Sequence, residues 1–263
     1  MRQLLARRDA RSSERRFVVE GAKAIGEALD AGAAVESVLV DDERVADAER
    51  RVVQRAAAAG AAVVELERGV MARVAGTVAP QGVMAVVEMV DVALGDVPPA
   101  SRDLVVVCAE VRDPGNLGTI VRTAGAAGAG AVVSCSGSVD LYNPKTVRAS
   151  AGAVFHVPVV AGPDAEEVLD ELGRWGLWRW GTVPRGGRDY AAADLAGPVA
   201  LTLGNEAHGL PPAVSSRLDG LLSIPMAGPA ESLNVAATAA VLCFEAARQR
   251  RAPLRLDGTA AAR

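Results

Sequence analysis

Apolar and polar positions alternate in blocks over the second half of the chain. The unbroken apolar run 104–108 fits a strand that is buried on both faces of a parallel sheet. The pattern predicts further strands at 131–134, 156–160, 177–182, 199–203 and 221–225, and helices at 117–127, 145–154, 165–173 and 233–250. This alternation predicts an open α/β sheet with helices on both faces.

The first part of the chain predicts a smaller α/β/α unit. Its expected strands are 17–21, 36–40, 62–66 and 82–89, and its expected helices are 22–30, 41–59 and 69–74. Gly95, Pro98 and Pro99 then indicate a linker. We therefore expect an N-terminal domain over 1–91, a linker over 92–102, a second domain over 103–251 and a loose tail over 252–263.

Composition and charge narrow the function classes. Half of the 263 residues are hydrophobic but only 3% are aromatic, so Val, Leu and Ala must fill the core. A net charge of −4 argues against broad, non-specific coating of nucleic acid, although a local basic patch can suffice. One such patch is possible in residues 1–16, for which a solvated, partly disordered N-terminus is the alternative. Its basic residues are Arg2, Arg7, Arg8, Arg11, Arg15 and Arg16.

The cysteines and histidines indicate a metal-free protein of a reducing compartment. Cys108, Cys135 and Cys243 are isolated in apolar surroundings without CxxC spacing, which is typical of buried thiols. His156 and His208 are far apart and lack metal-ligand spacing. Residues 1–16 do not read as a signal peptide, and no apolar run reaches the ~18 residues of a spanning helix. We expect a cytoplasmic protein without a membrane segment.

Three polar, glycine-rich joints follow predicted strands. The first, at 113–118, holds Asn116 with Arg122 nearly two helical turns further on; the second, at 203–210, holds Glu206; the third, at 224–235, holds Ser232 and Asn234. Each has a structural explanation alone, as helix caps, a helix-start acid or a surface ion pair. Ligands of such sheets bind beyond the carboxyl ends of the strands, so together the joints predict one composite ligand site. Neither a dinucleotide fingerprint nor a P-loop is present.

These joints resemble the three signature motifs of the SpoU/TrmH family of RNA ribose 2′-O-methyltransferases, in the SPOUT superfamily. The matching stretches are DPGNLGTIVRTAGAAGAGAVV, LTLGNEAHGL and IPMAGPAESLNVAATAAVLCFEAARQR, in the family's order and spacing. The opening FVVEGAKAIGEAL also resembles, more weakly, the family's N-terminal substrate-binding domain, which is similar to RNA-binding ribosomal proteins.

The resemblance implies a parallel sheet with a C-terminal trefoil knot, an exception to the rule against knots. It implies S-adenosylmethionine (SAM) as cofactor and a homodimer with sites near its interface. The implied catalytic and substrate-facing residues are Asn116, Arg122, Glu206, Ser232 and Asn234. The implied cofactor-binding residues are Leu203, Gly204, Asn205, Gly209, Ile224, Met226 and Leu233.

RNA is the implied partner, with rRNA favoured over tRNA because small tRNA enzymes of the family often lack the N-terminal domain. Few aromatic residues are available for stacking, so shape and backbone contacts should dominate. Candidate phosphate contacts are Arg7, Arg8, Arg11, Arg15, Arg16, Arg112, Lys145 and Arg148.

Arginine is almost never deprotonated, so we expect Arg122 to act as a cation that holds a phosphate and stabilises the forming alkoxide. The proton acceptor is left open between Glu206, a water and the RNA phosphate.

Other interpretations remain at this stage. Enzymes that confer thiostrepton-type resistance share the architecture, and the sequence does not separate resistance from housekeeping modification. A non-catalytic RNA-binding or assembly factor would also keep the fold, but the intact polar set argues against it. An unrelated nucleotide-binding α/β protein would require all three matches to be coincidental.

Overall fold

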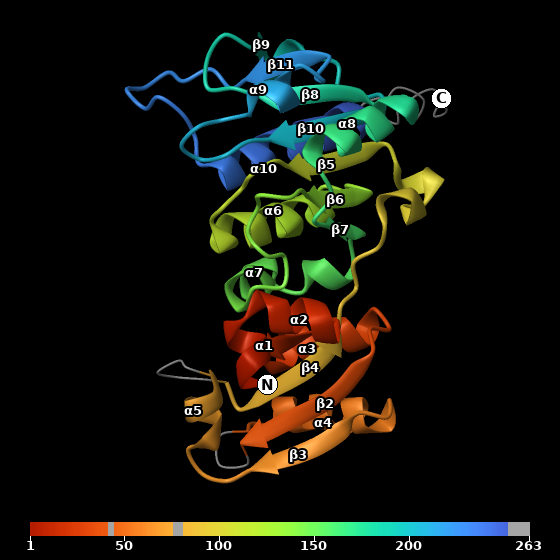
Figure 1. The fold of residues 1–263 in the computed structure, drawn as a ribbon, viewed down its shortest axis with the longest axis vertical. Helices are drawn as coiled ribbons and strands as arrows, with labels where there is room; N and C mark the ends of the chain where they lie inside the picture. Colours follow the sequence, from red (N-terminus) through yellow and green to blue (C-terminus); the bar gives the residue numbers. More distant parts are fainter. Residues whose placement is uncertain (42–44, 76–80, 252–263) are drawn as a thin grey trace, which may run out of the picture. The chain divides into compact units, whose positions relative to one another are not determined.

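The structure is a computed structural model of the chain, and it describes residues 1–41, 45–75 and 81–251. The chain divides into two compact units (Figure 1). Unit 1 consists of Met1–Val90 and Asp140–His156, and unit 2 of Asp91–Val139 and the chain from Val157 onward. The expected tail 252–263 lies outside the described residues.

Unit 1 is built on a four-stranded sheet in the order β1-β4-β2-β3. The strands are β1 (Arg16–Glu20), β2 (Val35–Asp41), β3 (Ala62–Leu66) and β4 (Val83–Glu88). β4 is antiparallel to both of its neighbours, and β2 is parallel to β3. The helices are α3 (Ala22–Asp30), α4 (Asp47–Ala58) and α5 (Val70–Ala75), in the order that the sequence predicts. The helix expected over 41–59 begins only at Asp47, because Asp41 belongs to β2.

Two short helices lie within residues 2–14, which contradicts the interpretation of a partly disordered N-terminus. They are α1 (Arg2–Ala6) and α2 (Arg8–Glu14). Leu4 is buried in the apolar core of unit 1. Arg11 is only 3% exposed, and its guanidinium binds the Asp140 carboxylate and donates to the Leu4 carbonyl. The expectation that Arg11 contacts RNA is therefore corrected, because its donors are used inside the fold.

Residues 140–156 belong to unit 1 by their contacts, although they lie within the sequence span expected for the second domain. The predicted helix 145–154 is divided into α7 (Pro144–Ser150) and a 3-10 turn, η3 (Ala153–Phe155). Ala151 and Gly152 both adopt left-handed backbone angles, which end an α-helix. Phe17 of β1 packs against the rings of Tyr142 and Phe155, with centroids 4.6 and 5.9 Å away.

Unit 2 contains a seven-stranded sheet in the order β7-β6-β5-β10-β8-β11-β9, and Figure 1 shows these strands side by side. All of its strand pairs are parallel, as the sequence predicts. The strands are β5 (Leu104–Cys108), β6 (Ala131–Ser134), β7 (Val159–Ala161), β8 (Trp178–Thr182), β9 (Arg188–Asp189), β10 (Val199–Leu203) and β11 (Gly220–Ser223). The two-residue edge strand β9 is too short to leave a sequence pattern.

The helices of unit 2 are α6 (Pro114–Ala126), α8 (Ala165–Arg174), α9 (Pro212–Ser215) and α10 (Val235–Arg251). Short 3-10 turns occur at η1 (Leu94–Asp96), η2 (Pro99–Ser101) and η4 (Tyr190–Ala192). α8 buries Val168, Leu169 and Leu172 against the strand residues of the core. α10 packs on α6 and β10. A search of the described residues found no helix with the length and apolar character that a membrane span requires.

Candidate functional site

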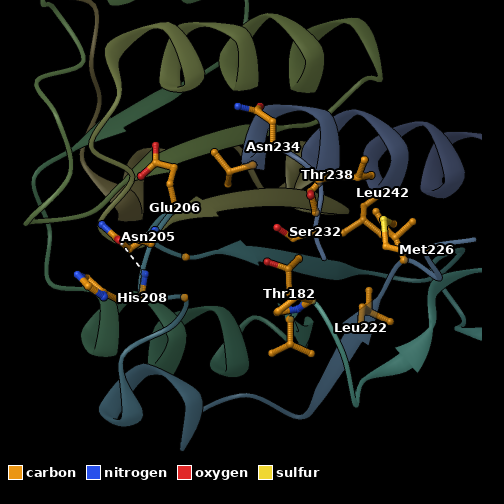
Figure 2. A pocket seen from close by; sticks show the side chains of 18 residues that line it. Thr182, Asn205, Glu206, His208, Leu222, Met226, Ser232, Asn234, Thr238 and Leu242 are labelled. Atoms are coloured by element: carbon orange, nitrogen blue, oxygen red, sulfur yellow. Dashed lines mark hydrogen bonds between the residues drawn. The ribbon is translucent and has the colours of Figure 1, made fainter. Parts of the chain in front are cut away.

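A pocket of about 510 Å³ lies at the carboxyl ends of the neighbouring strands β10, β8 and β11 (Figure 2). Its volume is within the range of small-molecule sites, roughly 300–1,000 Å³. Segments that follow the three strands and the start of α10 form its walls. These are residues 182–184, 204–209, 222–226 and 232–242, within which the lining residues include Leu222, Ile224, Met226, Ser232, Leu233, Asn234, Thr238 and Leu242.

The loop after β10 is closed tightly on itself. The backbone N–H groups of Asn205 and Gly209 each donate to the other residue's carbonyl, at 2.9 Å. A Cβ at Gly204 would lie 2.5 Å from the carbonyl carbon of Gly209, so only glycine permits this closure. Gly209 itself has φ +70°, a conformation that favours glycine. The two glycines thus serve a close approach of backbone to backbone.

Glu206 on this loop is anchored to the segment before α6. Its carboxylate accepts hydrogen bonds from the N–H groups of Arg112 and Asp113, both at 3.2 Å, and from Asn116 Nδ2 at 3.0 Å. Burial opposes ionisation, but the hydrogen bonds from Asn116 and the backbone outweigh it, so the pKa of Glu206 is lowered. No helix begins at Glu206, so its interpretation as a helix-start acid is wrong.

Asn116 connects the first joint to the other two. Asp113, rather than Asn116, caps α6, because Asp113 Oδ1 accepts from the Asn116 N–H at 2.8 Å. The side chain of Asn116 therefore bridges Glu206 and Asn234, whose Nδ2 donates to Asn116 Oδ1 at 2.9 Å. Asn234 also caps α10 by accepting from the Ala236 N–H. One hydrogen-bonded chain of side chains thus joins all three polar joints.

The rest of the pocket combines apolar walls with hydroxyl groups. Figure 2 shows Leu222, Met226 and Leu242 gathered at one end and Glu206 at the other. Thr182, Ser232 and Thr238 contribute hydroxyls between them. Such a lining suits a ligand with a flat apolar portion and a polar portion.

Most of the predicted site residues meet here. Six of the seven candidate cofactor residues line the pocket, and Leu203 is instead fully buried at the end of β10. Of the candidate catalytic residues, Glu206, Ser232 and Asn234 line the pocket and Asn116 bonds to two of them.

Arg122 lies outside this group. Its side chain is exposed on α6, and it is not among the lining residues. No ion pair of Arg122 occurs within the part of the chain that the structure describes, so its interpretation as a surface ion pair finds no support.

Sequence reasoning missed the wall that follows β8. Residues 182–184 come after a predicted strand, but they lack the glycine and the polar cluster that marked the other joints. Thr238 and Leu242 were hidden within an alanine-rich helical pattern. Their spacing from Asn234, four and eight residues on, places all three on one helix face, which was the available signal.

The basic residues proposed for RNA differ in their availability. Arg8, Arg15 and Lys145 are exposed. Four candidates form ion pairs with acidic side chains: Arg7 with Asp9, Arg16 with Glu36, Arg148 with Glu20, and Arg112, whose side chain is 67% exposed, with Glu110 at 3.5 Å. Among the described residues, no group of His, Cys, Asp or Glu side chains is placed to hold a metal ion.

The fold and the pocket define the class of the protein: a parallel α/β domain with a pocket of small-molecule size at the carboxyl ends of its strands, joined to a separate α/β unit. Residues 103–244 match the SpoU rRNA Methylase family, and residues 1–85 match the MRM3-like substrate binding domain. The chain belongs to the SpoU rRNA methylase family.

Relatives of known activity match nearly the whole chain. The 23S rRNA (guanosine(2553)-2'-O)-methyltransferase RlmP of Bacillus subtilis is 35% identical, over 89% of each chain. The 23S rRNA (uridine(2479)-2'-O)-methyltransferase of Streptomyces viridochromogenes is 36% identical, over 94% of this chain and 88% of the relative. Among solved structures, AviRb from Streptomyces viridochromogenes in complex with AdoMet has a TM-score of 0.83 at 33% identity, covering 94% of this chain and 95% of that one.

Proposed function

We propose that this protein is an S-adenosylmethionine-dependent methyltransferase that acts on a ribose 2′-hydroxyl of rRNA. The observation that carries the proposal is the hydrogen-bonded chain Glu206–Asn116–Asn234, which joins the three motif loops beside a ligand-sized pocket. The named relatives are 23S rRNA 2′-O-methyltransferases and match this chain over most of its length.

The pocket residues fit the cofactor. The apolar end, with Leu222, Met226 and Leu242, suits an adenine ring, and the closely packed backbone at Gly204 and Gly209 suits the polar groups of the cofactor. When bound, S-adenosylmethionine supplies an electrophilic methyl group. We also propose that the chain forms the family's trefoil knot around this pocket.

The protein's own residues then position the ribose. A neutral hydroxyl is a poor nucleophile, so its proton must leave and its oxygen must be held in line with the methyl group. Asn116, Asn234 and Ser232 offer neutral polar groups for this positioning. Glu206 is a weak candidate for the base, because backbone and Asn116 donors already occupy its carboxylate and its pKa is lowered. The proton therefore passes to a water or to the RNA phosphate.

Arg122 enters the site through dimerisation. Arg122 is exposed on α6, which packs on α10. Phe244 of α10 and Leu233, two residues before α10 begins, are 45% and 39% exposed. Burial of these apolar side chains would favour a homodimer through the α6 and α10 surface. In that dimer Arg122 of one protomer stabilises the forming alkoxide at the pocket of the other.

Mixed dimers test this arrangement. Arg122→Ala and Gly204→Ala homodimers should both be inactive, whereas a mixture that exchanges protomers should regain part of the activity, since one pocket per heterodimer has both parts intact. A mixture that stays inactive after verified exchange would contradict the shared site.

RNA recognition falls to unit 1 and to basic residues near the pocket. The match to a substrate-binding domain over residues 1–85 supports a structured rRNA target. The candidate phosphate contacts that remain are Arg7, Arg8, Arg15, Arg16, Arg112, Lys145 and Arg148. Three buried, unpaired thiols fit a reducing compartment, and we place the enzyme in the cytoplasm.

The test is transfer of labelled methyl from S-adenosylmethionine to separate pools of unmodified rRNA and tRNA. We expect label in the rRNA pool, and none when Asn116→Ala replaces the wild type. Label only in tRNA would overturn the substrate class. SAM binding without transfer to rRNA, tRNA or ribosomal particles would favour a non-catalytic RNA-binding factor.

A further inference from the structure

Only two of the residues that line the pocket carry titratable side chains, Glu206 and His208. The carboxylate of Glu206 is used to anchor the loop before α6. His208 thus supplies the imidazole of this site, and the reaction as described above gives it no task.

The fold holds the backbone of His208 firmly. Asn205 Oδ1 accepts hydrogen bonds from the N–H groups of Ala207 and His208, at 2.9 and 3.0 Å. Asn205 Nδ2 donates to the Glu110 carbonyl at 3.0 Å, which ties this loop to the one before α6. Asn205 is itself 8% exposed. A buried amide therefore fixes the position from which the His208 side chain projects.

The imidazole itself is exposed and has no hydrogen bond or ion pair to the residues that the structure describes. The other histidine, His156, differs, because its Nε2 lies 2.7 Å from Glu27 Oε2. Figure 2 shows the His208 ring at the rim of the pocket, on the side of Glu206 and away from Leu222 and Met226. The ring is thus placed toward whatever enters at the polar end, not toward the apolar end.

The rim carries acids together with exposed hydrogen-bond donors. Glu206 is the acid on the same loop, and its carboxylate already accepts from three N–H donors. The neighbouring loop, before α6, carries Glu110, Arg112 and Asp113. Asp113 caps α6. Arg112 is exposed, and its guanidinium lies 3.5 Å from the Glu110 carboxylate. The His208 imidazole and the Arg112 guanidinium are the exposed nitrogen donors of these two loops that can carry a positive charge.

We propose that His208 binds a phosphodiester oxygen of the RNA next to the target ribose and so positions that ribose over the pocket. This inference rests on the proposed function, since it takes RNA as the molecule that enters at the polar end. One imidazole N–H donates to the phosphate oxygen. No bond is made or broken by His208, which acts as a positioning residue.

The test compares His208→Ala, His208→Gln and His208→Arg with the wild type, and His156→Gln serves as the matched control away from the pocket. KM for unmodified rRNA, kcat, the Kd of the RNA by filter binding and the Kd of S-adenosylmethionine are measured at pH 6.5. We expect His208→Ala to raise KM and the Kd of RNA about tenfold, with the cofactor Kd unchanged. His208→Arg should restore RNA binding to within about threefold, a rescue that a merely structural role would not give.

Three outcomes decide the matter. Unchanged RNA binding in His208→Ala would overturn the inference. A raised Kd for S-adenosylmethionine with unchanged RNA binding would also overturn it, because His208 would then hold the cofactor carboxylate. RNA binding that weakens in His208→Ala, in a protein that transfers no methyl, would uphold the phosphate contact while refuting the proposed function.

Discussion

Replacing Glu206 with Gln separates an anchoring role from a role as base. The variant keeps one oxygen acceptor, but an NH2 group takes the place of the other carboxylate oxygen. That NH2 group cannot accept the hydrogen bonds that the carboxylate accepts in the wild type. Hydrogen bonds to a charged group contribute roughly 1.5–3 kcal/mol, but these are partly exposed and two are 3.2 Å long, so we expect a loss of about 1 kcal/mol in unfolding free energy. That corresponds to about 2–4 °C in Tm.

The pH dependence has a definite sign. The pKa of Glu206 is lowered in the folded protein, so its contribution to stability is complete above the unfolded value of 4.5 and is lost as the pH falls through the folded value. The Tm difference between wild type and Glu206→Gln should therefore be constant from about pH 6 to 8 and shrink in acid below about pH 4. Glu167→Gln is the matched control, because Glu167 is exposed and its carboxylate has no hydrogen bond or ion pair within the described residues.

Catalysis by the variant completes the test. Displacement of Asn116 by the loosened loop should lower kcat roughly 10- to 100-fold. If Glu206 anchors the loop, the pH profile of kcat keeps its shape in Glu206→Gln. Loss of a basic limb from that profile, with an unchanged Tm at pH 7, would refute the anchoring role and restore Glu206 as the base.

Other predictions follow from close contacts and burial. Gly204→Ala should weaken SAM binding, measured by calorimetry, at least about 100-fold, because the added Cβ would lie 2.5 Å from the backbone of Gly209. Near-normal affinity would show that the loop can shift to make room for the Cβ. Arg11→Ala should lower the free energy of unfolding, measured in denaturant, by about 3–5 kcal/mol, because it leaves the nearly buried Asp140 without its ion pair. Arg7→Ala removes an exposed ion pair and should change the free energy of unfolding little. Equal losses in the two variants would contradict this reasoning. Burial raises the pKa of the Cys108, Cys135 and Cys243 thiols, in the case of Cys135 and Cys243 to about 12. Alkylation of these thiols at pH 7.5 should therefore require unfolding of the protein. Rapid alkylation of the native protein would contradict their burial.

The strands of the parallel sheet were predictable because buried runs such as 104–108 are apolar without interruption, and 199–203 has only Thr202 among its apolar residues. The joints were predictable because glycine and small polar residues follow those strands. The hydrogen-bonded chain of Asn116 was not, since local pattern assigns a cap to any Asn near a helix start, and only the structure shows that Asp113 takes that position. Likewise, the buried pair of Arg11 and Asp140 joins residues 129 positions apart, which no local pattern records.

The packing of residues 140–156 in unit 1 also depends on long-range contacts that the local sequence pattern does not predict. The segment follows β6 and precedes β7, so the strand–helix alternation places it with the second sheet. Its contacts with Phe17 depend on Tyr142 and Phe155, two of the few aromatic residues in the chain. Long-range packing of this kind is invisible to periodicity.

The central claim concerns the atom that is methylated, and the chemistry of the product tests it most directly. Unmodified rRNA is incubated with the protein and methyl-labelled S-adenosylmethionine, hydrolysed in alkali and separated by mass spectrometry. Our account predicts label in an alkali-resistant dinucleotide, because a 2′-O-methyl group blocks cleavage at that ribose. Label in an alkali-sensitive nucleotide, on a base, would contradict it.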